Sequence, residues 1–172
     1  MQVRANKAMA APLPVPAVPG GLGPGYRIIS VREVEPDLLA EAFAYAYGPQ
    51  AFPLGASQAR AEIQEAFDGG FGQLIPAASL VAITSGQVAG VVMTVRRAPW
   101  PDIPSGPFII DLFSTPGHRR RGVARYLLHR AMANARPPDE TVIGLRVEID
   151  NAPAQRLYRS AGFHDWPNPS AT

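Results

Sequence analysis

Three consecutive arginines lie between an apolar run typical of a strand and a segment with helical periodicity. Arg119, Arg120 and Arg121 follow residues 108–113 and directly precede Gly122. Beyond the glycine, apolar residues recur at helical spacing, at Val123, Leu127, Leu128 and Ala131. A helix N-terminus exposes N–H groups that lack intrahelical acceptors and carries the positive end of the helix dipole. The sequence therefore predicts a cradle for a nucleotide-like anion with several phosphate groups.

A run of like charges taken alone is more often a solvated surface or a nucleic-acid patch. Two small residues favour the cradle, because Gly122 lets the backbone approach a ligand and Ala124 permits tight packing of the first helical turn. The net charge is only +2, from 16 basic and 14 acidic side chains. Positive charge is concentrated between residues 119 and 136, which favours a local ligand site. A nucleic-acid-binding module remains an alternative.

Two motifs in the second half of the chain resemble those of one enzyme family. Residues 119–124 fit the signature Q/R-x-x-G-x-G/A of the GCN5-related N-acetyltransferase (GNAT) family. Residues 151–163 resemble the family's N-x-x-A-x-x-L-Y-x-x-x-G-F helix. The resemblance is specific over residues 108–163 and looser from Tyr26 onward. It implies an N-acetyltransferase that transfers an acetyl group from acetyl-coenzyme A to a primary amine.

The resemblance also implies where the cosubstrate binds. In the family, two parallel strands spread apart and the pantetheine arm lies between them, while the basic loop holds the pyrophosphate. Carried over to this sequence, the cofactor-binding residues are Leu112, Phe113, Ser114, Arg119, Arg120, Arg121, Gly122, Val123, Ala124, Arg125 and Asn151. A backbone N–H near residues 112–114 would stabilise the oxyanion. No metal is expected.

The family's reaction needs a base for the amine and a proton for the departing thiolate. The motif makes Tyr158 the general acid, since a phenol with pKa ~10 is only slightly weaker as an acid than a thiol with pKa ~8.5. Candidate bases are Asp111, whose burial in an apolar strand would raise its pKa, and Glu148 near the end of the neighbouring strand. Relatives often carry a glutamate where this chain has Ile110. An ordered water is therefore an alternative to a carboxylate base.

Hydrophobic periodicity predicts an α/β (α+β) fold with a mixed, mostly antiparallel sheet. Strands are expected at 26–32, 79–84, 87–95, 108–113 and 141–149, and helices at 36–46, 57–67, 123–135 and 151–161. Ser85-Gly86 predicts a hairpin. The strand-helix-strand order after residue 108 makes the strands 108–113 and 141–149 parallel, and the resemblance implies that they are the central splayed pair. Helices should flank this sheet.

Domain boundaries follow from the distribution of proline and glycine. Residues 1–25 are predicted to be a disordered tail, because 11–25 contains five prolines and four glycines, and residues 26–172 form the acetyltransferase domain. After Phe163 only nine residues remain, so at most one short strand fits and the family's last C-terminal strand can be absent. The acceptor site would then be open, or a neighbouring subunit or the proline-rich loop 98–107 would complete it.

Composition excludes several kinds of chemistry. The chain has no cysteine, and its three histidines show no metal-ligand spacing. No apolar run approaches the ~20 residues that span a bilayer, so a cytoplasmic protein without membrane contact is expected. The acceptor would be a small-molecule or peptide amine, and a homodimer is possible. The alternative within the same fold is a non-catalytic domain that senses an acyl-coenzyme A or docks a partner.

Overall fold

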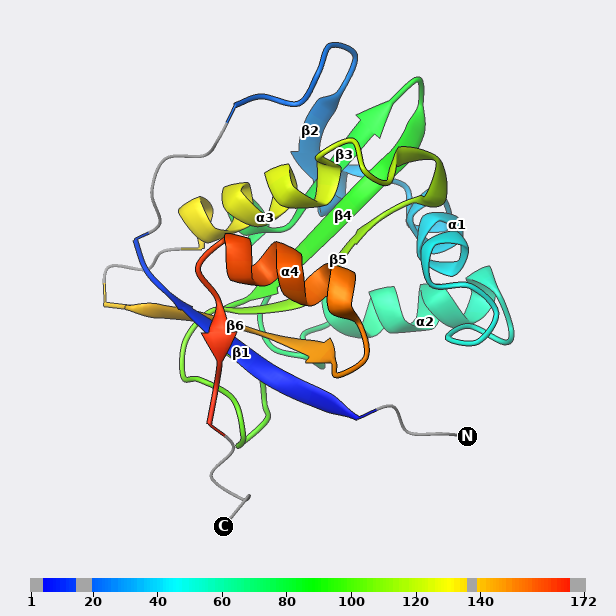
Figure 1. The fold of residues 1–172 in the computed structure, drawn as a ribbon. Coiled ribbons are helices and arrows are strands. Elements are labelled where there is room, and N and C mark those ends of the chain that lie inside the picture. Colours follow the sequence, from blue (N-terminus) through cyan, green and yellow to red (C-terminus); the bar gives the residue numbers. More distant parts are fainter. Residues whose placement is uncertain (1–4, 15–19, 136–138, 168–172) are drawn as a thin grey trace.

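A mixed sheet forms the centre of the computed structural model, which describes residues 5–14, 20–135 and 139–167 and has seven strands within them (Figure 1). The strands are β1 (Asn6–Pro12), β2 (Arg27–Ser30), β3 (Leu80–Thr84), β4 (Gln87–Val95), β5 (Phe108–Ser114), β6 (Val142–Glu148) and β7 (His164–Asp165). The helices are α1 (Pro36–Tyr47), α2 (Ala56–Phe67), α3 (Val123–Asn134) and α4 (Ala152–Ser160). Short 3₁₀ turns lie at Val31–Glu33, Pro76–Ala78 and Pro116–His118.

The strand order is β2-β3-β4-β5-β6-β1-β7, and every neighbouring pair is antiparallel except β5 and β6. This arrangement confirms the predicted fold class and the predicted parallel pair. The hairpin between β3 and β4 turns at Ser85 and Gly86, both with positive φ, as the dipeptide predicts. Each predicted helix and strand from residue 26 onward has a counterpart within a few residues.

Strands β5 and β6 pair over a very short length. Their register covers only Phe108 opposite Gly144 and Ile109 opposite Leu145. The register between β4 and β5 shifts at the same level, between Met93 and Thr94, so one residue of β5 bulges out there. From residue 110 onward the two parallel strands are unpaired with each other. The predicted splay therefore begins at residue 110.

The prediction of a disordered tail is wrong for residues 6–12. They form β1, which pairs with β6 along its whole length and with β7 at Met9 and Ala10. Both of these residues are completely buried. The sheet thus extends past β6 by two strands, with β7 the single short strand expected after α4 and β1 supplied from the N-terminal segment. Residues 1–4, 15–19 and 168–172, which belong to the predicted tail and C-terminus, lie outside the described residues.

Helices cover both faces of the sheet (Figure 1). On one face α3 and α4 pack over a core that includes Leu127, Met132 and Tyr158, and on the other α1 and α2 pack over a core that includes Phe43 and Ile63. The close approach of α3 depends on Gly90 in β4. A side chain there would lie 2.7 Å from Val123 and 2.8 Å from the carbonyl oxygen of Phe113. This packing fixes the N-terminus of α3 beside the end of β5.

The proline-rich loop 98–107 is irregular, as predicted, and packs against β6. The guanidinium group of Arg146 lies 4.8 Å from the centre of the Trp100 ring and forms an ion pair with Asp102. The Trp100 ring also contacts Phe108, with the ring centres 5.6 Å apart. These contacts fix the loop against the sheet at the paired end of β5.

Candidate active site

The splayed end of β5 presents backbone N–H groups on the side of β6. Thr115 donates its N–H to the carbonyl oxygen of Ala89 at 2.9 Å, so its backbone faces β4. Residues alternate along a strand, so Phe113 faces β4 as well, whereas Leu112 and Ser114 turn their N–H groups toward the gap. These two groups lie in the segment to which the resemblance assigned the oxyanion contact.

The basic loop enters α3 through backbone conformations that expose amides. Arg120 and Gly122 have positive φ, at 61° and 79°, and Gly122 is the N-cap of α3. None of the described side chains caps this helix. The first-turn amides of Val123, Ala124 and Arg125 consequently have no intrahelical acceptor. Such a terminus binds phosphate oxygens well, because the amides and the helix dipole act together.

The arginines of the loop have different surroundings. Arg119 donates to the carbonyl oxygen of Ala46 at 2.9 Å, which links the loop to the end of α1. Arg120, Arg121 and Arg125 are exposed. Within the described part of the chain, none of these three side chains forms a hydrogen bond or an ion pair. They are therefore available to a polyanionic ligand, and the residues present fit a pyrophosphate group.

Two of the predicted cofactor-binding residues have buried side chains. Phe113 packs edge-on against Phe43, with ring centres 4.7 Å apart, and against Tyr47 at 5.4 Å. Val123 is 1% exposed and lies in the core beneath α3. Both side chains support the fold, and Val123 can contact a ligand only through its backbone.

Asp111 forms a hydrogen-bonded pair with a residue that the sequence analysis missed. The hydroxyl of Tyr47, at the end of α1, donates to Asp111 Oδ1 at 3.0 Å. Burial raises the pKa of Asp111 to about 7, although the hydrogen bond from Tyr47 opposes this change and the charge of Glu62 adds to it. Desolvation and the neighbouring Asp111 hold the pKa of Tyr47 well above its ordinary value. Asp111 is thus poised to exchange a proton near neutral pH.

Tyr158 lies on α4 and is 8% exposed. Its ring contacts Phe163, with ring centres 5.9 Å apart. Burial, and then the charge of Asp111, raise its pKa to about 12. The structure therefore brings the phenol and the carboxyl into one electrostatic environment. A phenol of this pKa stays protonated throughout the neutral range and is a hydrogen-bond donor there.

Glu148 and Asn151 lie where β6 passes into α4. Asn151 is the N-cap of α4, and its Oδ1 accepts the N–H of Ala154 at 3.1 Å. The Gln155 amide donates to the carbonyl oxygens of Glu148 and Ile149 at 3.2 and 2.8 Å, which fixes α4 against the strand end. Glu148 is half-buried and is the last residue of β6, where it pairs with Asn6 of β1. The Asn151 oxygen accepts a capping hydrogen bond, and its amide nitrogen is the group that could donate to a cofactor.

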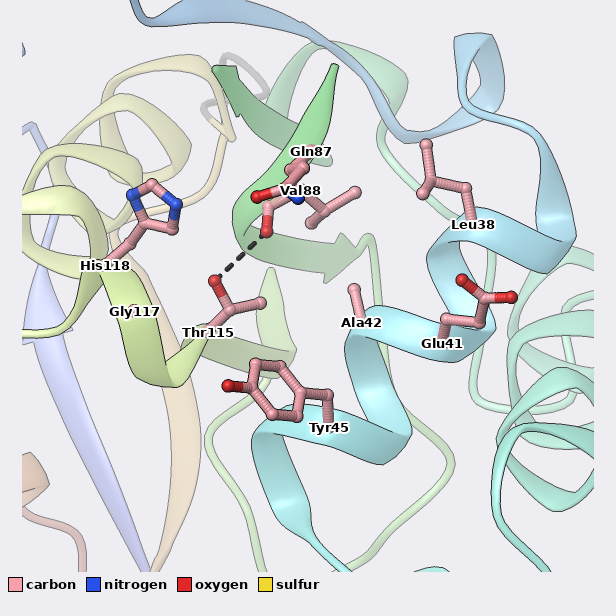
Figure 2. Close-up of a pocket in the computed structure, with 9 residues that line it drawn as sticks. All are labelled: Leu38, Glu41, Ala42, Tyr45, Gln87, Val88, Thr115, Gly117 and His118. Carbon is pink, nitrogen blue, oxygen red and sulfur yellow. Dashed lines mark hydrogen bonds between the residues drawn. The ribbon is translucent and has the colours of Figure 1, made fainter. Parts of the chain in front are cut away.

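A cavity of about 450 Å³ lies beside the basic loop, between α1, the start of β4 and residues 115–118 (Figure 2). Glu41 and Tyr45 line it from α1, and His118 lines it from the loop. The His118 ring is held by Tyr26, whose hydroxyl lies 3.1 Å from Nδ1. None of Asp111, Glu148 and Tyr158 lines this cavity. It adjoins the loop without containing the candidate catalytic groups.

Substitution of Gly122 tests the cradle. The position is open, with nothing within 4 Å of an added side chain, but its φ of 79° is unfavourable for valine. We expect Gly122→Val to weaken coenzyme A binding about tenfold or more, measured by calorimetry. Gly86→Val is the matched control, since Gly86 has a φ of 74°, is equally open and lies in the β3–β4 hairpin. Equal affinities of the two variants would contradict the cradle.

The described residues contain neither a cluster suited to a metal ion nor a helix suited to a membrane span. Within residues 5–14, 20–135 and 139–167, no group of three or more histidine, aspartate or glutamate side chains could hold a metal ion. None of the helices in that part of the chain has the length and apolar character needed to cross a membrane.

Comparisons with known proteins agree with this architecture. No curated protein sequence matches the chain significantly. Among solved structures, a GCN5-related N-acetyltransferase from Sphaerobacter thermophilus is 24% identical with a TM-score of 0.68, over 95% of this chain and 49% of that one. A GNAT-family protein from Novosphingobium aromaticivorans is 25% identical with a TM-score of 0.60, over 96% of this chain and 61% of that one.

An aminoglycoside N-acetyltransferase in complex with CoA is 19% identical with a TM-score of 0.62, over 88% of this chain and 95% of that one. The chain spans about half the length of the Sphaerobacter protein. The sequence profile of the acetyltransferase (GNAT) family matches residues 39–163, which is most of the chain and includes both motifs. The chain therefore belongs to the acetyltransferase (GNAT) family.

Proposed function

We propose that this protein is an N-acetyltransferase that transfers an acetyl group from acetyl-coenzyme A to a primary amine. The observation that carries the proposal is the convergence at the splay of β5 and β6. Leu112 and Ser114 turn backbone N–H groups toward the gap there, Asp111 lies on the same strand, and the charge of Asp111 raises the pKa of Tyr158, so the phenol is within electrostatic reach of the carboxyl. Each of these groups meets one requirement of acyl transfer to an amine.

Donor binding would use the loop and the helix that follows it. The first-turn amides of α3 and the side chains of Arg120, Arg121 and Arg125 bind the pyrophosphate, and guanidinium groups add charge-assisted hydrogen bonds. Arg119 keeps the loop against α1 through Ala46. The pantetheine arm would enter the gap that β5 and β6 leave, which places the thioester beside Asp111 and Tyr158.

The chemical step requires a neutral amine. A lysine-like amine has a pKa of ~10.4, so Asp111 takes its proton, directly or through a water molecule. Acetyl-coenzyme A supplies the thioester that the amine attacks. The N–H groups of Leu112 and Ser114 stabilise the negative charge that develops on the carbonyl oxygen. A new C–N bond forms as the C–S bond breaks.

Tyr158 acts on the departing sulfur. Its pKa of about 12 lies above that of a thiol at ~8.5, so full proton transfer would cost about 5 kcal/mol. This free-energy cost is larger than the cost expected for a phenol with the ordinary pKa of ~10. The larger contribution of Tyr158 is therefore a hydrogen bond that stabilises the developing thiolate.

An assay of coenzyme A release tests the proposal. Acetyl-coenzyme A is incubated with the protein and with a panel of amines that includes a polyamine, an aminoglycoside and a lysine peptide. Release that depends on one class of amine supports the enzyme and identifies its acceptor. Binding of acetyl-coenzyme A without release of coenzyme A for any amine would favour the acyl-coenzyme A sensor instead. The feature that motivates this alternative is isoleucine at position 110, where relatives often carry a glutamate.

Tyr158→Phe separates binding from turnover. We expect kcat to fall about 100-fold, because the hydrogen bond to the sulfur exists only as the C–S bond breaks. Coenzyme A affinity should change less than threefold. Tyr45→Phe, at a site that is 64% exposed, is the control and should leave both quantities unchanged. Unreduced kcat in Tyr158→Phe would remove Tyr158 from the mechanism.

A further inference from the structure

The C-terminal turn of α1 has carbonyl oxygens that no N–H group of the helix can reach. The last four carbonyl groups of any α-helix lack intrahelical donors. In α1 the N–H of Gly48 satisfies Ala44, and the last turn contains no basic residue of its own. A cation at this end of a helix is favourable, because the helix dipole is negative there. A cation that stabilises this end must therefore come from another part of the chain.

Arg119 supplies this cation from 73 residues away. Its Nη2 donates to the carbonyl oxygen of Ala46 at 2.9 Å. The contact combines a charge-assisted hydrogen bond with the attraction of the dipole. Arg120 and Arg121 are also exposed, but their side chains form no hydrogen bond or ion pair with described residues. The guanidinium group of Arg119 is thus occupied, unlike those of its two neighbours.

The same turn of α1 carries the partner of the candidate base. Tyr47, the residue after Ala46 and the last of the helix, donates its hydroxyl to Asp111 Oδ1 at 3.0 Å. Its ring packs against Phe113, with the ring centres 5.4 Å apart. The end of α1 is therefore tied to both ends of the segment 111–119, and that segment includes the end of β5.

Packing alone does not hold the loop against α1. The cavity of about 450 Å³ separates the helix from residues 115–118, and Tyr45 and His118 face it from the two walls (Figure 2). Atoms on either side of a cavity lose the van der Waals contacts that close packing would give them. The hydrogen bond from Arg119 therefore provides a connection between the two walls that packing does not.

We propose that Arg119 is a positioning residue for the proton acceptor of the reaction. Its guanidinium group fixes the last turn of α1, and Tyr47 on that turn fixes the carboxyl of Asp111. The resemblance assigned Arg119 to the donor, whereas this role sets its side chain apart from those of Arg120 and Arg121. The role rests on the proposed function, in which Asp111 takes the proton of the amine.

The groups around Asp111 determine what the loss of Arg119 changes. Tyr47 faces the carboxyl from α1, and Glu62 of α2 and Tyr158 of α4 interact with it electrostatically. Of these three, only Tyr47 lies on the turn that Arg119 caps. The hydrogen bond from Tyr47 lowers the pKa of Asp111, so a looser turn raises that pKa. The rise of kcat/KM with pH should then move to higher pH.

Arg119→Met tests this role, because methionine keeps an unbranched side chain and removes the donor. We expect the rise of kcat/KM to move up by about half a pH unit or more, the effect of weakening one hydrogen bond. At pH 7 kcat/KM should therefore fall about twofold or more. Coenzyme A affinity, measured by calorimetry, should change less than threefold. Arg119→Lys keeps a charged donor and should restore most of the wild-type pH profile.

Arg120→Met is the matched control, since it changes the adjacent exposed arginine. We expect it to weaken coenzyme A binding about threefold or more and to leave the pH of the rise unchanged. A double variant that combines Tyr47→Phe with Arg119→Met should show the same pH profile as Tyr47→Phe alone. The two changes are not additive, because either one breaks the path from Arg119 to Asp111.

NMR titration of the Asp111 carboxyl in the ligand-free protein measures the same effect without turnover. Arg119→Met should raise the pKa of Asp111, and Arg120→Met should not. A wild-type pKa in Arg119→Met would overturn the proposal, as would a tenfold loss of coenzyme A affinity with an unmoved pH profile. Absence of acetyl transfer to every amine would refute the proposed function, and the titration would still decide whether Arg119 acts on Asp111.

Discussion

Replacing Met9 by lysine is expected to lower the free energy of unfolding by about 3–5 kcal/mol, the cost of placing a charge in the core of the sheet. Met9 is completely buried in β1, opposite Leu145 of β6 and Asp165 of β7. Typical domains are stable by about 5–15 kcal/mol, so this change removes a large part of the total. Urea denaturation followed by circular dichroism measures it.

The control for this change is the same substitution at an exposed leucine. Leu54 is 76% exposed, so Leu54→Lys should change stability by less than about 0.5 kcal/mol. Indistinguishable midpoints for the two variants would mean that residues 6–12 are not part of the stable fold. A destabilised Met9→Lys protein should also bind coenzyme A less well, because β1 supports β6 along one side of the splay.

The sequence of β1 explains why it could not be recognised. Residues 6–12 read Asn-Lys-Ala-Met-Ala-Ala-Pro, with no β-branched or aromatic residue and no alternation of apolar and polar positions. Its strand conformation comes from pairing with β6 and β7, which are more than 125 residues away in the chain. By contrast β4, β5 and β6 are rich in valine and isoleucine, so their own composition was enough to predict them within two residues.

The candidate site also contains residues that the sequence could place and one, Tyr47, that it could not. The loop 119–124 and Tyr158 lie in local motifs, so the sequence placed them on the correct elements. Tyr47 is 64 residues from Asp111 and no local pattern distinguishes it. The only available signal was the spacing of Phe43 and Tyr47, four apart on α1, which turns both rings toward Phe113. A hydrogen bond between distant segments becomes visible only once the sheet has placed α1 against β5.

Asp111→Asn is expected to reduce kcat/KM by a factor of about 100 to 10,000 above pH 7, because the amide cannot take the proton of the amine. Wild-type kcat/KM should rise with pH through about 7, the pKa of Asp111, and the variant should lose that rise. Tyr47→Phe provides the control. It removes the hydrogen bond that lowers the pKa of Asp111, so the rise should move to higher pH while the plateau is largely kept.

Asp111→Asn should raise the stability of the folded protein at pH 8 while it lowers the activity. The pKa of Asp111 is raised in the folded protein from an unfolded value of ~3.9, so the folded state holds its proton more tightly. The resulting stabilisation is complete below pH ~4 and is lost as the pH rises through about 7. Asp111→Asn removes this loss, so the variant should melt at a higher temperature than the wild type at pH 8. A variant that lost activity and stability together would indicate a structural role for Asp111, whereas higher stability with lower activity identifies a carboxyl retained for proton transfer.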